Sequence, residues 1–339
     1  MMDERLRKPR IDDVARRAGV STATVSRALA TPDQVKPKTR AAVEKAVLET
    51  GYVLNVAARN LRTNRTHAVL AVVPDVANIF FSQVLRGISD TLHQHGYRLV
   101  IADTGNDPER ERDHAEFAQA GWVDGLLLLN GRLLPTPPGG RRRLAVPTVS
   151  LCERIPGSDI PYVETANREA ARAMTEHLLQ LGHRRIGYVC GPPNNILEHD
   201  RFAGYRDALA ARGLVPDLAL VRPGDYTLAA GEAAASAYLA LPELPDAVFA
   251  SNDAMAMGLI RGFTAAGLSV PEAISIAGFD DIEFAGAYNP ALTTVHQARS
   301  EIGARATTML IDLIEGRQPA SREVHLPAEI VMRDSTRER

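Results

Sequence analysis

The chain has 339 residues, of which 45% are hydrophobic and 24% charged, a composition typical of a folded protein with two or three domains. Its net charge of −2 conceals an asymmetry, because residues 1–66 hold 14 Lys and Arg against 7 Asp and Glu, and the remainder holds 25 against 34. A basic head on an acidic body is typical of a small nucleic-acid-binding module joined to a domain that repels DNA. A solvated basic face would give the same count.

Several classes of protein are excluded. No apolar run approaches the roughly 20 residues of a membrane helix, and the charged N-terminus is not a secretory signal, so we expect a cytoplasmic protein without membrane contact. Cys152 and Cys190 lie in apolar strand-like runs, which predicts buried reduced thiols rather than a disulfide or a zinc site. Glycine motifs for dinucleotides or phosphates are missing, and the histidines lack metal-ligand spacing. We therefore expect no enzyme, no cofactor and no metal.

The stretch from Ile11 to Ala30 predicts two short helices joined by a tight turn. Apolar residues recur at helical spacing on both sides of Gly19, and glycine at a helix end tolerates a positive φ. Ser21 or Thr22 can cap the second helix by accepting a backbone N–H. This pattern is a helix-turn-helix, whose second helix fits a DNA major groove. Any two short amphipathic helices with glycine between them look similar, so the context must support it.

Residues on either side complete this N-terminal plan. A third helix over Lys38–Thr50 closes a small core, which predicts a DNA-binding headgroup at 11–54 behind a disordered arm at 1–10. The segment 55–66 is rich in arginine but has too few apolar residues to fold alone. It is either a flexible linker or a hinge helix that forms only on DNA.

From residue 67, apolar strands alternate with helices, which predicts parallel sheets covered on both faces. The expected strands are 67–73, 97–104, 124–130, 147–152, 185–191, 219–222, 247–253, 274–281 and 293–297, with a final strand pair within 323–335. The expected helices are 80–95, 109–119, 167–181, 201–212, 228–241, 254–266 and 300–315. These strands are too many for one comfortable sheet, so we expect five to six in each of two lobes.

Polar side chains follow several of these strands. In parallel sheets, ligands bind beyond the carboxyl ends of the strands. Two lobes that face each other across such loops would form a ligand cleft, although each residue taken singly could simply cap a helix. The residues concerned are Asp75, Asn78, Asn252, Asp253, Asp280 and Asp281.

Motifs along nearly the whole chain point to one family. In order they are IDDVARRAGVSTATVSRAL, KTRAAVEKAVLETGY, AARNLRTNRT, VVPDVANIFFSQVLRGI, LGHRRIGYVCGP, FASNDAMAMGLI, ISIAGFDD and PALTTVHQ. With these motifs the chain resembles the LacI/GalR family of bacterial transcriptional repressors. The stretches VSTATVSRAL, ARNLRTNRT and VVPDVANIFFS are most similar to the cytidine-repressor subgroup.

The resemblance implies an α/β fold with an N-terminal three-helix helix-turn-helix headgroup, a hinge helix and a two-lobed core like a periplasmic binding protein. The core spans 67–339, with lobe one at about 67–165 plus 294–318 and lobe two at about 166–293 plus 319–339. It further implies a homodimer that binds a near-palindromic double-stranded DNA operator. A small effector between the lobes would control the affinity for that operator.

The same resemblance assigns residues to the DNA contacts. Arg27 can make the bidentate contact to guanine that a guanidinium suits, and Ala23 offers a methyl group. The positions for base reading are Thr22, Ala23 and Arg27, those for the DNA backbone are Ser21, Thr24 and Ser26, and those for the hinge in the minor groove are Arg59, Leu61 and Arg62. Leu61 falls where the family inserts a leucine that kinks the duplex.

For the effector, the resemblance implies aromatic side chains that stack on a ring and polar side chains that hold hydroxyls or amines. We favour a nucleoside, with a sugar or a sugar phosphate as the alternative. Arg201 is expected to open its helix, and Gln297 to lie where the chain crosses back between lobes. The positions are Phe80, Phe81, Arg201, Tyr226, Asn252, Asp253, Asp280 and Gln297.

Two positions depart from the family pattern. Leu54 stands where the family usually has proline, which would loosen the start of the hinge. Ala166 stands where the family has an aspartate that often binds the effector, and Glu164 is a candidate replacement. A more distant alternative is a small-molecule binding protein without a DNA role, but such a protein needs export and gives the basic head no purpose.

Overall fold

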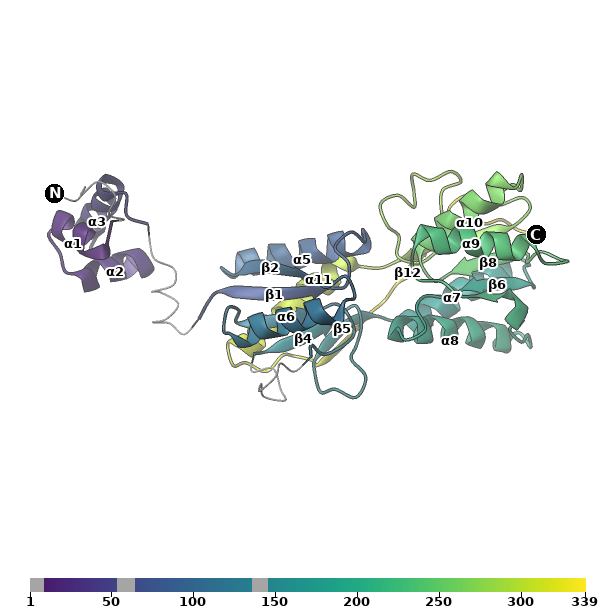
Figure 1. Cartoon of the computed structure of the whole chain (residues 1–339), viewed down its shortest axis with the longest axis horizontal. Coiled ribbons are helices and arrows are strands. Elements are labelled where there is room, and N and C mark those ends of the chain that lie inside the picture. Colours follow the sequence, from purple (N-terminus) through teal and green to yellow (C-terminus); the bar gives the residue numbers. More distant parts are fainter. Residues whose placement is uncertain (1–8, 54–64, 136–145) are drawn as a thin grey trace. The chain divides into compact units, whose positions relative to one another are not determined.

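The computed structural model describes residues 9–53, 65–135 and 146–339. The chain forms two compact units, one that ends at Arg65 and one that begins at Thr66, and each is described by itself (Figure 1). The hinge helix predicted at 55–66 lies almost entirely outside the described residues, as does most of the predicted arm at 1–10.

The N-terminal unit contains a helix-turn-helix. Its described helices are α1 (Ile11–Ala18), α2 (Thr22–Ala30), the 3-10 turn η2 (Pro32–Gln34) and α3 (Pro37–Thr50). Gly19 ends α1 with a φ of 67°, the left-handed conformation that favours glycine. Ser21 caps α2, because its hydroxyl oxygen accepts a hydrogen bond from the backbone N–H of Thr24 at 3.2 Å. The predicted turn is therefore confirmed together with its cap.

One small hydrophobic core holds these helices together. Val14 of α1, Val25 of α2 and Val43 of α3 are fully buried against one another, with alanines filling the space between them. The burial of Val25 fixes which face of α2 points inward, and so leaves its opposite face to solvent.

Lobe one, as the name is used below, is built on a sheet in which every neighbouring pair of strands is parallel. In the described part of the core this sheet has six strands, in the order β11-β5-β4-β3-β1-β2. The strands are β1 (Ala68–Val73), β2 (Arg98–Asp103), β3 (Gly125–Leu128), β4 (Thr148–Leu151), β5 (Tyr162–Thr165) and β11 (Glu323–Leu326). The helices are α5 (Phe80–Gln94), α6 (Pro108–Gln119) and α11 (Arg299–Ile314).

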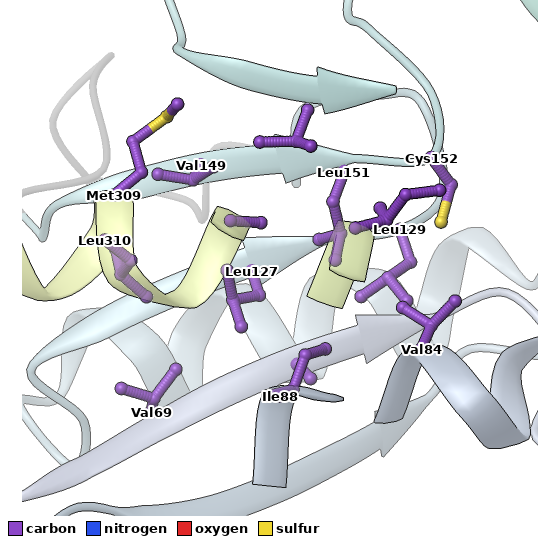
Figure 2. Packing of buried hydrophobic residues seen from close by; sticks show 14 of the residues in the cluster. Val69, Val84, Ile88, Leu127, Leu129, Val149, Leu151, Cys152, Met309 and Leu310 are labelled. Atoms are coloured by element: carbon purple, nitrogen blue, oxygen red, sulfur yellow. The ribbon is translucent and has the colours of Figure 1, made fainter. Parts of the chain in front are cut away.

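Alternate side chains of these strands enter different hydrophobic layers. Val69 of β1 and Leu127 of β3 pack with Ile88 of α5 and Leu310 of α11, as Figure 2 shows. Their neighbours in sequence, such as Leu70 and Leu126, pack with alanines of α6 in a separate layer. The sheet is thus covered on both faces, as the continuous apolar strands predict.

Helices α5 and α11 approach each other closely where both carry glycine. A Cβ on Gly87 of α5 would lie 2.0 Å from the carbonyl oxygen of Ser300, and one on Gly303 of α11 would lie 2.2 Å from the carbonyl oxygen of Val84. Any larger residue would push the two backbones apart. Together these helices hold the first and last thirds of the chain in one lobe (Figure 1).

Lobe two combines two smaller sheets with four helices in the described part of the chain. The parallel sheet has the order β7-β6-β8-β9, and β10 pairs with β12 in antiparallel fashion. The strands are β6 (Ile186–Val189), β7 (Val221–Arg222), β8 (Ala247–Ala250), β9 (Ser275–Ala277), β10 (Thr294–His296) and β12 (Glu329–Val331). The helices are α7 (Asn167–Gln180), α8 (Ile196–Ala211), α9 (Leu228–Leu239) and α10 (Asp253–Ala265), and the 3-10 turn η3 (Leu218–Leu220) precedes β7.

The strand pairings correct the expected lobe boundaries near the C-terminus. The expected division places 294–318 in lobe one and 319–339 in lobe two, but Val295 of β10 is buried in a core cluster of lobe two, and β11 pairs with β5 in the sheet of lobe one. The expected final strand pair is also not a pair, because β11 and β12 belong to different lobes. A short strand's pattern shows its buried face but not its partner, which is set by chain far away in sequence.

Two further elements differ from expectation. Strand β5, over Tyr162–Thr165, was not predicted. Helix α8 begins at Ile196 because Asn195 caps it, with its side-chain oxygen accepting from the N–H of Leu197 at 2.8 Å. Arg201 therefore lies inside the helix and does not open it.

The cysteines and the apolar helices give two further observations. Cys152 is a buried free thiol, as predicted, whereas Cys190 is only partly buried. Among the described residues, no helix is both long and apolar enough to cross a membrane.

Candidate DNA and effector sites

Helix α2 presents the side chains expected to read bases. Thr22, Ala23 and Arg27 are exposed, whereas Val25 and Ala28 of the same helix are buried in the headgroup core. The exposed residues do not belong to the headgroup core, so they can contact DNA while the headgroup stays folded. These positions hold a guanidinium, a hydroxyl and a methyl group, which are all groups that read base edges in a major groove.

The hydroxyls expected on the DNA backbone already have local partners. Ser21 caps α2, and its hydroxyl lies 2.9 Å from that of Thr24. Ser26 is only partly exposed. A phosphate contact by Ser21 or Thr24 would therefore use a hydroxyl that is already engaged in a local hydrogen bond. The hinge positions Leu54, Arg59, Leu61 and Arg62 lie outside the described residues.

Arg201 is the centre of the polar group in lobe two. Its side chain is 3% exposed, and it donates from Nε to the side-chain oxygen of Asn167 at 2.9 Å and from Nη1 to the carbonyl oxygen of Ser251 at 2.6 Å. Nη2 lies 3.8 Å from a carboxylate oxygen of Asp280. A buried guanidinium requires such partners, because an unpaired charge in the interior is costly.

Asp280 and Gln297 connect this group to lobe one. The amide Nε2 of Gln297 donates to Asp280 at 2.7 Å, and the hydroxyl of Thr165 in β5 donates to the Gln297 oxygen at 2.6 Å. Burial raises the pKa of Asp280 to about 6, while Arg201, Arg299 and the bond from Gln297 oppose that rise. Gln297 follows β10, where the chain leaves lobe two for α11, and so bridges the two lobes at a crossing segment.

Asn252 and Asp253 begin helix α10 and are strongly engaged within lobe two. Asn252 accepts from the N–H of Met255 and donates to the carbonyl oxygen of Tyr226, both at 3.0 Å. The fully buried carboxylate of Asp253 accepts from the N–H of Ile282 and from the hydroxyl of Thr294. Burial, together with the charge of Asp280, raises the pKa of Asp253. Both residues thus fix the loops around Arg201.

Tyr226 has an unusual backbone and an unpaired hydroxyl. Its φ is 69°, a strained value for an aromatic residue. The ring lies on the backbone of Gly191, where a Cβ would come within 2.3 Å of it. The buried hydroxyl has no hydrogen-bond partner among the residues that the structure describes. A buried polar atom without a partner is costly and marks a place where a bound ligand can supply one.

Phe80 and Phe81 occupy a different environment from the polar residues. They are the first residues of α5, are 9% and 6% exposed, and belong to the core of lobe one. Their rings meet edge to face at 5.2 Å between centroids. Arg299, whose guanidinium lies 6.0 Å from the Phe80 ring, links Phe80 to the neighbourhood of Asp280, whereas Phe81 packs in the core.

Two acidic residues near Arg201 were missed from the sequence. Burial raises the pKa of Glu153 to about 7, and its carboxylate accepts from the amide of Asn195 at 3.0 Å. Glu198 of α8 is 4% exposed, accepts from the N–H of Gly191 at 2.6 Å, and has a pKa that burial raises. Glu153 lies two residues after the end of β4. The search for polar residues at the carboxyl ends of strands would therefore have found it.

These groups set out what the site can bind. Arg201 is one buried cation among the carboxylates of Glu153, Glu198 and Asp280, and Tyr226 adds a ring and a hydroxyl. Such a group suits a neutral, hydrogen-bonding molecule with a ring. In the described ranges, no set of His, Cys, Asp and Glu side chains is suited to hold a metal ion.

Comparison with known proteins places the chain in a family. Residues 10–55 match the description "Bacterial regulatory proteins, lacI family", and residues 175–336 match "Periplasmic binding protein-like domain". The chain is 39% identical to the HTH-type transcriptional repressor CytR of Escherichia coli K12, across 96% of this chain and 95% of that protein. It is 35% identical to the HTH-type transcriptional regulator CelR of Thermobifida fusca, across 98% and 99%.

Solved structures agree over the full length. The lac repressor dimer bound to operator and the anti-inducer ONPF matches with a TM-score of 0.85 and 28% identity, over 98% of this chain and 100% of that one. A CelR–cellobiose complex matches with a TM-score of 0.74 and 33% identity, over 97% and 100%. The chain therefore belongs to the LacI family. It is a DNA-binding transcriptional repressor and not an enzyme, which confirms the family resemblance and the fold class expected from the sequence.

Proposed function

We propose that this repressor acts in the cytoplasm as a homodimer whose affinity for a near-palindromic operator is set by a small effector bound between the lobes, and that the effector is a nucleoside. The observation that carries the effector site is the buried hydroxyl of Tyr226, which lacks a partner in the described chain and lies in the electrostatic neighbourhood of Arg201, Asp280 and Glu153. An effector that forms a hydrogen bond with this hydroxyl supplies the missing partner, and this bond increases the affinity for the effector.

The chemistry of the site supports a nucleoside. The ring of Tyr226 offers a stacking surface, the amide of Asn252 lies at the backbone of Tyr226, and Asp280 provides a carboxyl close to Arg201. A base with a sugar presents both a flat ring and hydroxyls to such a set. Sugars remain the second candidate, because the similar CelR structure is a cellobiose complex and another similar regulator of the LacI family was solved with bound ribose.

Two surfaces support the dimer and the operator. Strand β2 is one of the two edge strands of the lobe-one sheet in the described part of the chain, and its Ile101 is 45% exposed. Nearby in sequence, Phe117 and Trp122 stack at 6.2 Å, with Trp122 63% exposed. An open edge and exposed aromatics are surfaces that a second copy can cover. A two-fold dimer would present two α2 helices, one to each half of the operator.

The test is a thermal-shift screen of the full-length protein with cytidine, other nucleosides, purine bases, cellobiose, ribose and sugar phosphates. A ligand at about 100 times its Kd adds roughly 2.7 kcal/mol to the folded state. A shift with nucleosides alone supports the proposal, and a shift with sugars alone replaces the nucleoside by a sugar. No shift with any compound contradicts the proposed effector class.

A pair of tyrosine variants then locates the site. Tyr226→Phe removes an unpaired hydroxyl, so we expect it to weaken ligand binding about threefold to tenfold without loss of stability. Tyr238→Phe is the matched control, because the Tyr238 hydroxyl donates to the carbonyl oxygen of Leu220 at 2.7 Å. That variant should lower stability and leave the ligand affinity unchanged. Equal ligand affinity in the wild type and in Tyr226→Phe would show that the Tyr226 hydroxyl does not contact the ligand.

A further inference from the structure

The loop between β4 and β5 reaches across to lobe two. Both of its ends are anchored in the sheet of lobe one, yet two consecutive side chains bond to helix α8. The carboxylate of Glu153 accepts from the side-chain amide of Asn195, the residue that caps α8. The guanidinium of Arg154 donates to Asp200 one turn further along that helix. These bonds add to the link through Gln297 and to the chain segments that cross between the lobes, such as the one between β5 and α7.

Arg154 divides its guanidinium between the lobes. Nη1 and Nη2 both donate to the carboxylate of Asp200, with Nη2 at 3.0 Å, and Nη1 also donates to Glu164 of β5 at 3.0 Å. Glu164 is 2% exposed and is further approached by His325 of β11 at 3.3 Å. The buried carboxylate of Glu164 therefore fixes Arg154 to lobe one. Both terminal nitrogens of the guanidinium point to Asp200 in lobe two. Two-bond pairs of this kind are stronger and more directional than single surface pairs.

The backbone supports the same arrangement. Cys152, which begins the loop, has a φ of 65° although it is not glycine, and its side chain is buried in the core of lobe one. Such a conformation persists only where surrounding contacts hold it. Burial also limits screening, since the side chains of Arg154 and Asp200 are 29% and 23% exposed.

We infer that Arg154, Asp200 and Glu164 form an interlobe latch that holds the loop after β4 of lobe one against helix α8 of lobe two. Arg154 is the positioning residue, Glu164 holds it in lobe one, and Asp200 is its counterpart in lobe two. A change in the angle between the lobes would then have to break or stretch the bonds between Arg154 and Asp200. Its meaning for regulation rests on the proposed function, but the latch itself needs neither effector nor DNA. A failed effector screen would leave its test intact.

The test compares two charge-neutralising variants of the same helix in the full-length protein. Asp200→Asn removes the carboxylate that crosses the lobes. Asp207→Asn is the matched control, because Asp207 pairs with Arg168 at 2.7 Å within lobe two. Hydrogen–deuterium exchange followed by mass spectrometry reports on the loop at 152–161 and on the start of α8. Small-angle X-ray scattering reports on the separation of the lobes through the radius of gyration.

We expect Asp200→Asn to speed exchange in both segments about threefold to tenfold and to increase the radius of gyration, whereas Asp207→Asn changes neither. Arg154→Met should have the same effect, and adding Asp200→Asn to it should change nothing more, because the two residues act through one bond. The latch is refuted if Asp200→Asn behaves like Asp207→Asn, if the radius of gyration stays constant, or if the effects of Arg154→Met and Asp200→Asn simply add.

Discussion

The guanidinium of Arg201 lies over the ring of Phe279, with Cζ 3.8 Å from the ring centroid. This contact joins helix α8 to the residue that precedes Asp280, so one side chain connects the ring, the carboxylate and the carbonyl oxygen of Ser251. A cation that is desolvated over an aromatic face is stabilised by about 2 kcal/mol. Arg201 therefore organises lobe two before any effector arrives, and its removal should be felt in stability as well as in binding.

Arg201→Met tests this role. The variant keeps most of the side-chain volume. It removes the guanidinium of α8 that is paired with the buried carboxylate of Asp280. Removing one partner of a buried pair typically costs about 3–5 kcal/mol, so we expect a loss of that size in the free energy of unfolding, measured by urea denaturation. Arg206→Met is the control, because Arg206 is exposed on the same helix. Equal stability of the two variants would show that Arg201 is not needed to compensate Asp280.

The raised pKa of Glu153 predicts a pH dependence of stability. Because the folded pKa, about 7, is above the ordinary value near 4.3, the folded protein binds the proton more tightly than the unfolded chain does. The stabilisation from this group is complete below the unfolded pKa and is lost as the pH rises through about 7. Glu153→Gln keeps a side-chain oxygen for Asn195 but cannot titrate, so its urea midpoint should fall less than that of the wild type between pH 4.5 and 7.5.

The control for this pH series is Glu283→Gln, since Glu283 is exposed. Its urea midpoints should follow those of the wild type across the range. If the wild type and Glu153→Gln kept a constant difference at every pH, the proton on Glu153 would not contribute to stability.

Features that depend on neighbouring residues could be predicted from the sequence, whereas strand partners that are distant in the chain could not. The helix-turn-helix follows from Gly19 and Ser21, whose roles depend only on their neighbours. The partner of β11 could not be predicted, because Val324 and its neighbours align with a strand about 160 residues earlier. The start of α8 was misplaced because the cap at Asn195 follows two prolines that suggest a loop.

The same distinction holds for the site. Strand-end position pointed to Asp280 and Asn252, and both lie in the polar group around Arg201 and Tyr226. Their individual roles could not be predicted, because hydrogen bonds such as that between Gln297 and Asp280 depend on how the chain returns between lobes. The pairing of Arg154 with Asp200 joins residues on different lobes, and no local pattern specifies it.

Gly87→Ala tests the close contact between α5 and α11. The new methyl group would lie 2.0 Å from the carbonyl oxygen of Ser300, which belongs to the backbone and cannot turn away. Overpacking of this kind typically costs about 1–3 kcal/mol, although alanine favours helices more than glycine does. We expect a lower free energy of unfolding for lobe one, seen by calorimetry. Ser89→Ala, at an exposed position of the same helix, should be nearly neutral, and a stabilised Gly87→Ala would contradict the contact.

Arg27→Ala tests base reading by α2. Arg27 is exposed, so the headgroup should keep its fold, as circular dichroism can check. Loss of a bidentate contact to guanine weakens specific binding by about 1–3 kcal/mol and non-specific binding much less. Fluorescence anisotropy with a duplex selected from random sequences, and with an unrelated duplex at the same salt concentration, measures both. Arg16→Ala, at a highly exposed position of α1, controls for loss of charge alone. Equal weakening on the two duplexes would assign Arg27 to the phosphate backbone instead of to a base.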